Sequence, residues 1–158
     1  MLALLYAPPT ALASVELVRR ATNNFEGIAK DRVAVVGSLG KLIGSGDVEI
    51  LREAGFDPIE IDQHNTHLIR HLGRDADVVI TGMGRPGAIT KEDLARPFGA
   101  DAPMYIIDGG IGIGEDDRPA QDLDPDVFDL EYVWATKRTK AVGPLAVALM
   151  FGNVIASD

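Results

Sequence analysis

Residues 32–46 read RVAVVGSLGKLIGSG, an apolar run that leads into a turn containing four glycines. The run Arg32–Val36 predicts a short buried strand, because three valines and an alanine fill it without interruption. A helix is predicted over Asp47–Ala54, and Gly55 closes it. A strand, a glycine-rich turn and a helix in this order open a βα unit, so this segment predicts an α/β fold.

The rest of the chain repeats the alternation of strands and helices. Further strands are predicted over Pro58–Ile61, Asp77–Ile80, Met104–Ile107 and Tyr132–Ala135. Helices are predicted over Ala11–Asn23 with Thr10 as N-cap, over Thr66–Leu72 up to Gly73, over Thr90–Ala95 and over Pro144–Ala156. Near-continuously apolar strands indicate a parallel sheet that helices cover on both faces. The sequence therefore predicts one domain over residues 1–158, with a doubly wound, Rossmann-like and mostly parallel sheet.

Two segments carry expectations about exposure. The final helix is apolar almost all round, which is typical of a buried helix. The segment Glu115–Asp129 is acidic and contains two prolines, which favours a loop in solvent. Its residues Asp122, Asp124 and Asp126 imitate the start of a calcium-binding loop, but valines stand where such a loop needs its glycine and its final glutamate.

Composition narrows the classes of partner. The chain has 158 residues, a formal net charge of -9 and no cysteine. An acidic chain repels phosphate backbones, so nucleic acid is not an expected partner. No apolar run approaches the roughly 20 residues that cross a bilayer. The apolar start Met1–Tyr6 is short and has no basic flank, so we expect neither a signal peptide nor a membrane partner, and a cytoplasmic location.

A metal site is not predicted either. The spacing of His64, His67 and His71 places them roughly on one helical face, and three imidazoles are a possible zinc set. However, His64 falls in a loop before the predicted helix, and no carboxylate obviously converges on the three rings. A solvated helix face is the better interpretation.

The turn after Val36 has the chemistry of a phosphate-binding loop. Glycine lets the backbone approach a pyrophosphate, and the following helix offers N–H groups. The spacing is not G-x-G-x-x-G, so an ordinary βα loop explains the turn equally well. Asp62 ends the next predicted strand, where a carboxylate accepts hydrogen bonds from ribose hydroxyls and repels the phosphate of NADP. A helix-capping or solvent-facing aspartate is the alternative.

Several short sequence motifs occur in the same order as in one known protein family. Residues 8–18 resemble P-C-T-P and the helix after it, residues 33–44 resemble a strand and the G-R-S-x-x-V-G-x-P loop, and residues 76–87 resemble A-D-I-x-x-x-A-x-G-x-P-G. Residues 106–112 resemble I-D-V-G-I-N, and residues 136–150 resemble the ends of T-P-V-P-G-G-V-G-P-M-T-x-A-M-L. Together they resemble the NAD(P)-binding, C-terminal domain of the methylenetetrahydrofolate dehydrogenase/cyclohydrolase family.

The chain also departs from that family. In the family, an N-terminal domain carries the folate pocket and a catalytic lysine and tyrosine. This chain begins at the P-C-T-P string, so we expect no counterpart of those groups and predict no catalytic residue. Ser38 replaces the arginine of G-R-S, the loop is one residue longer, and Lys137–Ala141 replaces P-V-P-G-G.

The resemblance and the turn chemistry together predict a dinucleotide site at the carboxyl ends of the strands. The predicted cofactor-binding residues are Gly37, Ser38, Leu39, Gly40, Ile43, Gly44, Asp62, Gln63, His64, Thr81, Gly82, Met83, Gly84, Gly110, Ile111 and Thr136. NAD is the expected cofactor and NADP the weaker ligand, because Asp62 stands beside the ribose and Ser38 lacks a guanidinium. Lys41, His64 or Arg70 would offset part of this preference by reaching a phosphate.

The resemblance implies NAD(P)-dependent oxidation of methylenetetrahydrofolate, a folate substrate that a separate folate-binding lobe would hold. The chain alone is not expected to be a self-sufficient enzyme. A non-catalytic NAD-binding or assembly module is the alternative function. We expect a homodimer or a complex with another chain, because the family pairs through this domain and apolar surface is expected near Tyr6–Thr10 and the final helix.

Overall fold

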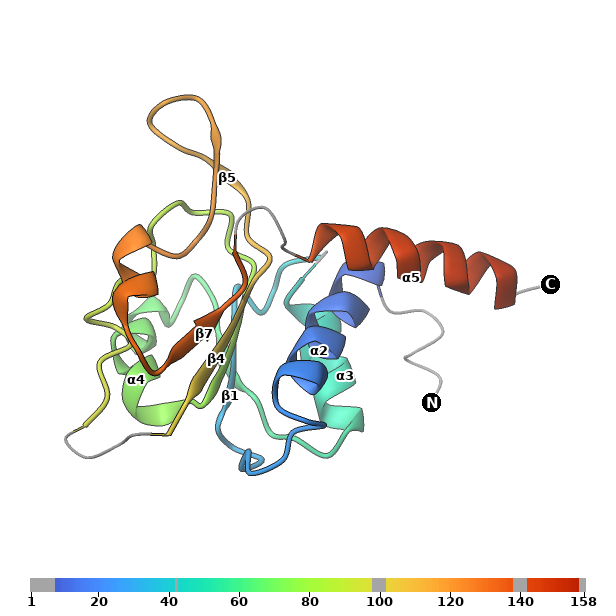
Figure 1. The fold of residues 1–158 in the computed structure, drawn as a ribbon, viewed down its shortest axis with the longest axis horizontal. Helices are drawn as coiled ribbons and strands as arrows, with labels where there is room; N and C mark the ends of the chain where they lie inside the picture. Colours follow the sequence, from blue (N-terminus) through green and yellow to red (C-terminus); the bar gives the residue numbers. More distant parts are fainter. Residues whose placement is uncertain (1–7, 42, 98–101, 138–141, 157–158) are drawn as a thin grey trace.

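The structure, a computed structural model, describes residues 8–41, 43–97, 102–137 and 142–156. Five parallel strands form the main sheet in the order β2-β1-β3-β4-β7 (Figure 1). They are β1 (Val33–Val36), β2 (Ile59–Ile61), β3 (Val78–Thr81), β4 (Met104–Asp108) and β7 (Val133–Ala135). All five predicted strands are therefore confirmed. The valines and isoleucines of β1, β3 and β4 are buried, and each such side chain contributes roughly 1.5–3 kcal/mol to folding.

The strand order opens a crevice at the carboxyl edge of the sheet. The chain goes from β1 outward to β2 and then returns to β3 on the other side of β1. The connections after β1 and β3 therefore run in opposite directions and leave a gap between them. Open α/β sheets bind their ligands in such a gap. The last residues of the central strands lie side by side, since Val36 pairs with both Ile61 and Thr81, and Thr81 pairs with Asp108.

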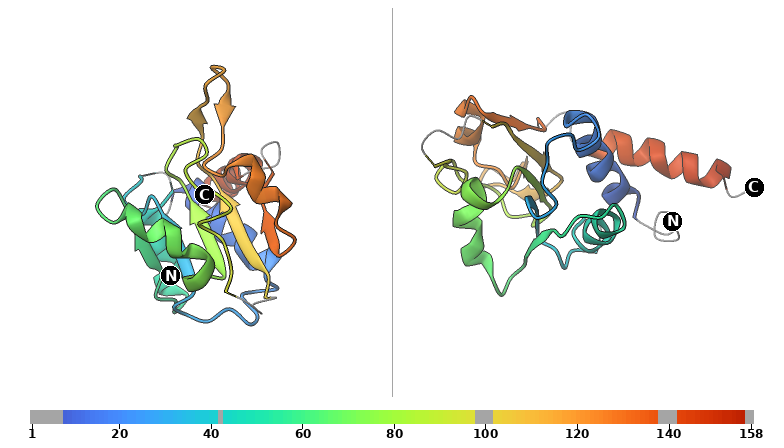
Figure 2. Two further views of the ribbon diagram at one scale, coloured as in Figure 1. Left: turned by 90° about the vertical axis from the view of Figure 1, so that its left-hand side faces the viewer. Right: turned by 90° about the horizontal axis from the view of Figure 1, so that it is seen from below.

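Helices cover both faces of the sheet, as predicted. The helices α2 (Pro9–Ala21), α3 (Ser45–Glu53) and α5 (Gly143–Ala156) lie on one side, and α2 packs against both of the others (Figures 1 and 2). The other face carries η1 (Thr66–His71), α4 (Leu72–Asp75) and η2 (Pro125–Asp129). Successive strand residues point to opposite faces, so Val33 and Val35 join one apolar cluster and Ala34 and Val36 the other.

Three helix predictions need correction. The helix α2 begins at Pro9 with Pro8 as its N-cap, because proline suits the first helical position, so Thr10 lies inside the helix. The predicted helix Thr66–Leu72 is a 3₁₀ helix that passes into α4, and Gly73 lies within α4, where a Cβ would overlap Leu94. The segment Thr90–Ala95 forms turns, although Asp93 accepts hydrogen bonds from the N–H and hydroxyl of Thr90, both at 2.8 Å, as it would at a helix start.

The expectation of a buried final helix was wrong, whereas the expectation of an exposed acidic segment holds for most of Glu115–Asp129. The helix α5 packs on α2 along one side and extends past the other helices, and Val147 is 51% exposed (Figure 1). The acidic segment forms η2 and part of a projecting hairpin, β5 (Gly112–Ile113) with β6 (Pro119–Ala120) (Figure 2). Asp122 in that segment is fully buried, since the turn after β3 closes over it.

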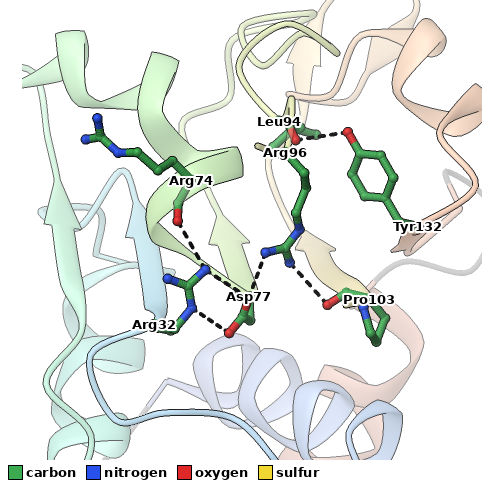
Figure 3. Close-up of polar contacts among 7 residues, drawn as sticks. All are labelled: Arg32, Arg74, Asp77, Leu94, Arg96, Pro103 and Tyr132. Carbon is green, nitrogen blue, oxygen red and sulfur yellow. Dashed lines mark hydrogen bonds and ion pairs between the residues drawn. The ribbon is translucent and has the colours of Figure 1, made fainter. Parts of the chain in front are cut away.

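Ion pairs close the amino edge of the sheet. Asp77 directly precedes β3, and its carboxylate accepts hydrogen bonds from Arg32 Nε at 2.6 Å and Arg96 Nη1 at 2.9 Å (Figure 3). Arg96 also binds the carbonyl of Pro103 at 3.2 Å. Burial alone would raise the pKa of Asp77, but the bonds from the two guanidinium groups outweigh burial and lower it. This cluster joins the starts of β1, β3 and β4.

Within the described residues, no helix is long and apolar enough to span a membrane.

Candidate functional site

Two neighbouring pockets occupy the carboxyl edge of the sheet. The β2-side pocket, about 430 Å³, is lined by Gly37, Leu39, Gly40, Ile61, Asp62, Gln63, Thr66, Gly82, Met83 and Arg85. The β4-side pocket, also about 430 Å³, is lined by Thr10, Gly40, Lys41, Ile43, Gly82, Gly109, Gly110, Ile111, Val142 and Gly143. Gly40 and Gly82 line both pockets, so the two form one crevice across the ends of β1 and β3.

Close backbone packing builds the centre of the crevice. Gly37 has φ +84°, a conformation that L side chains rarely adopt, and its N–H binds the carbonyl of Ile61 at 2.7 Å. A Cβ on Gly37 would lie 3.1 Å from the carbonyl carbon of Gly82. The backbones of the turns after β1 and β3 therefore meet directly at Gly37 and Gly82, while the Ile43 side chain packs on Gly82 and Gly109. Glycine backbone at a pocket wall is what an extended polar ligand such as a pyrophosphate needs for close approach.

A buried acid ties the glycine turn to two helices. Asp47 lies in the first turn of α3 and is fully buried. Its carboxylate accepts a hydrogen bond from the Ser14 hydroxyl on α2 and another from the Gly44 N–H at 2.8 Å. Burial raises the pKa of Asp47 to about 6, against the opposing effect of these two bonds. The sequence analysis missed this role, although an acid three residues after a glycine at a helix start is a recognisable capping pattern.

A second buried acid holds the turn after β3. Asp122 accepts hydrogen bonds from the Thr81 hydroxyl at 2.6 Å and from the Met83 and Arg85 N–H groups, both at 2.7 Å. A Cβ added to Gly110 would overlap this carboxyl group, so Asp122 lies directly behind the turn after β4. One side chain thus positions both walls of the crevice. The sequence analysis placed Asp122 in a solvated loop and missed this function.

A third acid completes this support. Asp108 ends β4, is almost fully buried, and accepts hydrogen bonds from the Gly110 and Leu123 N–H groups, both at 3.0 Å. Its own N–H binds the Thr136 hydroxyl at 2.9 Å. Burial, with a smaller contribution from the nearby Asp122, raises the pKa of Asp108 to about 7, against the opposing effect of the backbone N–H bonds. The hydroxyl groups of Thr81 and Thr136 therefore form hydrogen bonds within the walls of the crevice.

Asp62 was predicted either to face a ribose or to cap a turn, and the structure shows features of both. Its carboxylate accepts a hydrogen bond from the His64 N–H at 2.7 Å, and its N–H binds the Asn65 side chain at 2.7 Å, which makes it a turn residue. Asp62 also lines the β2-side pocket and is only partly buried. A carboxylate held by the turn therefore faces the crevice.

The structure gathers most of the predicted site residues at this edge. Those that line one or both pockets are Gly37, Leu39, Gly40, Ile43, Asp62, Gln63, Gly82, Met83, Gly110 and Ile111. Those that line neither pocket are Ser38, Gly44, His64, Thr81, Gly84 and Thr136. Ser38 is 2% exposed, and its hydroxyl has no hydrogen-bond partner among the described residues.

The cations at the crevice agree only in part with those that the sequence suggested. Arg85 lines the β2-side pocket and Lys41 lines the β4-side pocket, whereas Arg70 and His64 line neither. Arg85 was missed because nothing local distinguishes it from other surface arginines. Among the described residues, no three histidine, aspartate or glutamate side chains gather as a metal site.

A family comparison matches this architecture. The family model described as tetrahydrofolate dehydrogenase/cyclohydrolase, NAD(P)-binding domain, matches residues 8–158. The chain belongs to this family. It is 31% identical over 155 residues to the bifunctional protein FolD 2 of Mesorhizobium japonicum, covering 96% of this chain and 47% of that protein. A FolD protein of Staphylococcus epidermidis is 26% identical, with 97% and 50% coverage.

Solved structures show the same fold. A bifunctional FolD enzyme from Campylobacter jejuni superposes with a TM-score of 0.75 at 21% identity, covering 96% of this chain and 50% of that one. The Trypanosoma brucei methylenetetrahydrofolate dehydrogenase-cyclohydrolase, solved with NADP and an inhibitor, gives 0.74 at 22% identity, with 94% and 49% coverage. The chain thus spans about half the length of the relatives it matches and corresponds to their C-terminal, NAD(P)-binding domain.

Proposed function

We propose that the crevice binds a nicotinamide adenine dinucleotide, with the adenosine in the β2-side pocket and the nicotinamide in the β4-side pocket. The observation that carries this proposal is that the two pockets meet at Gly40 and Gly82, beside the strand-order reversal. Glycine backbone lines both pockets there, which favours close approach of a pyrophosphate that joins the two halves of the dinucleotide. Calorimetric titration with NAD tests the proposal, and absence of binding contradicts it.

We infer that NAD binds more tightly than NADP. Asp62 lines the adenosine end, where its free carboxylate oxygen accepts bonds from ribose hydroxyls and repels a 2′-phosphate. The expected preference is at least about tenfold. Asp62→Ser should reduce it, because serine keeps an oxygen that accepts the His64 N–H but removes the charge. Asp31→Ser, before β1 at the opposite edge, is the matched control. Tighter NADP binding by the wild type contradicts the inference.

We propose further that the chain supports the oxidation of methylenetetrahydrofolate together with a folate-binding lobe. The bound cofactor supplies the hydride acceptor, while Asp122 and Asp108 hold the turns that orient it. Because remote substrate contacts support positioning at the reacting carbon, the chain alone is expected to be nearly inactive. The assay compares turnover by the purified chain with turnover after a separately produced folate-binding lobe is added. Full activity of the chain alone, free of contaminating enzyme, contradicts this expectation.

A non-catalytic assembly module is the second candidate, and exposed apolar side chains favour it. Ile111 and Ile113 on the hairpin are each 69% exposed, and α5 leaves Val147 in solvent. Contiguous apolar surface usually marks a protein contact, which supports a homodimer or a complex with another chain. Tyr6, which was also expected at such a surface, lies outside the described residues. Sedimentation equilibrium tests association, and a monomer at all concentrations argues against a homodimer.

A further inference from the structure

Arg85 is a cation at the adenosine end that the sequence analysis did not identify. Among the described residues that line the β2-side pocket, Arg85 alone is cationic and Asp62 alone is acidic. Arg32, Arg52, Arg74 and Arg96 form ion pairs, whereas the Arg85 guanidinium has no ion pair or hydrogen bond with any described residue. Its charge is therefore available to an anion in the pocket.

The backbone of Arg85 is fixed although its side chain is exposed. Its N–H donates to Asp122 Oδ1 at 2.7 Å, and Asp122 is fully buried. Pro86 follows and restricts the chain on the other side. A guanidinium that starts from a fixed point at the pocket wall loses less freedom on binding than one on a mobile loop. Replacement of the side chain leaves the N–H bond to Asp122 in place.

Resting on the proposed function, we propose that Arg85 binds the 5′-phosphate of the adenosine half of the dinucleotide. The arginine that the family carries after its first glycine is Ser38 here, and Ser38 is buried and does not line the pocket. Arg85 supplies the guanidinium from the turn after β3 instead. A 2′-phosphate would lie beside the Asp62 carboxylate, so the phosphate shared by NAD and NADP is the one that Arg85 meets. Charge-assisted bonds from a guanidinium suit this contact.

Titration of Arg85→Ala with adenosine, AMP, NAD and NADP tests the assignment. We expect AMP, NAD and NADP each to bind about tenfold more weakly than to the wild type, and adenosine to bind within about twofold of it. Arg85→Lys should recover part of the loss, because it keeps the charge without the planar fork. Arg70→Ala is the matched control: Arg70 is also exposed and forms no ion pair with any described residue, but it does not line the pocket. The thermal midpoint of Arg85→Ala should equal that of the wild type.

Each other result overturns the assignment. An equal loss for adenosine shows that Arg85 stacks on the base, and a loss confined to NADP shows that it meets the 2′-phosphate. Equal losses in Arg70→Ala show that only the overall charge matters, and unchanged affinities show no contact. A wild-type chain that binds none of the four ligands overturns the proposed function and the role of Arg85 with it.

Discussion

The amino and carboxyl edges of the sheet both hold acids, partly buried at the amino edge and buried at the carboxyl edge, and the partners of these acids differ. At the amino edge, Asp77 is paired with the guanidinium groups of Arg32 and Arg96 (Figure 3). At the carboxyl edge, the carboxylates of Asp108 and Asp122 accept hydrogen bonds from backbone N–H groups and from one threonine hydroxyl. The pKa of Asp77 is lowered, whereas that of Asp108 is raised to about 7.

This difference separates an edge that is closed from an edge that can receive a ligand. Arginine side chains at the amino edge bridge the starts of three strands and fill the space between them. At the carboxyl edge, the acids hold the turns from behind, and glycine backbone together with side chains such as Ile43 lines the front. This arrangement leaves room for a ligand but lowers stability, because ionising the buried Asp108 carboxyl group without a cation beside it costs free energy.

The largest effect is expected from Asp122→Ala. The Thr81 hydroxyl and two N–H groups lose their shared acceptor, so the free energy of unfolding should fall by about 4 kcal/mol. The turn after β3 is then no longer held, and the affinity for NAD should fall more than about tenfold. Denaturant unfolding and calorimetry measure the two effects. A destabilised variant that binds NAD normally would show that other contacts position the turn.

Gly110→Ala tests the same contact from the opposite wall. The new methyl group would overlap the Asp122 carboxyl group, and the shift needed to admit it should cost about 3 kcal/mol of unfolding free energy and weaken NAD binding. Gly143→Ala is the control, because a Cβ there meets nothing within 4 Å. Equal stabilities of the two variants would mean that the turn after β4 adapts freely.

Asp77→Asn is expected to change stability without changing the site. It weakens two ion pairs at the amino edge, and because Asp77 is partly exposed the loss should be about 2 kcal/mol. NAD affinity should stay within about twofold of the wild type, since the crevice lies at the other ends of the strands. A clear loss of affinity would show that the two edges are coupled.

The smallest effect concerns pH. The folded-state pKa values of Asp47 and Asp108 are raised to about 6 and about 7, so the folded chain binds more protons than the unfolded chain at mildly acidic pH. Their contribution to stability is complete below about pH 4 and is lost as pH rises through 6 and 7. Asp108→Asn should reduce the fall in stability between pH 5 and 8 by at least about 1.4 kcal/mol, measured by urea unfolding across pH. An identical pH profile in the variant would place the titration elsewhere.

Much of the architecture was predictable because its signals are local. The apolar runs located every strand of the main sheet, and the glycines after Val36 and Thr81 located the crevice. The short β5–β6 hairpin was missed, since two-residue strands carry no periodicity. The predicted helix at Thr90–Ala95 forms only turns, although Asp93 binds Thr90 as it would at a helix start. Pro97 follows at once and disfavours the helical conformation of Arg96.

By itself, the sequence determined the strand-and-turn order, the doubly wound fold and the edge at which the glycine-lined pockets lie, because hydrophobic spacing and glycine positions act over a few residues. Only the tertiary structure decided which acids are buried and which cation faces the pocket. Asp122 meets its three donors across 37 to 41 positions of chain, and Arg85 reaches the pocket because that contact fixes its backbone. Burial of a polar group depends on such distant partners, so an acidic stretch that looks solvated can supply the residue that holds a site together.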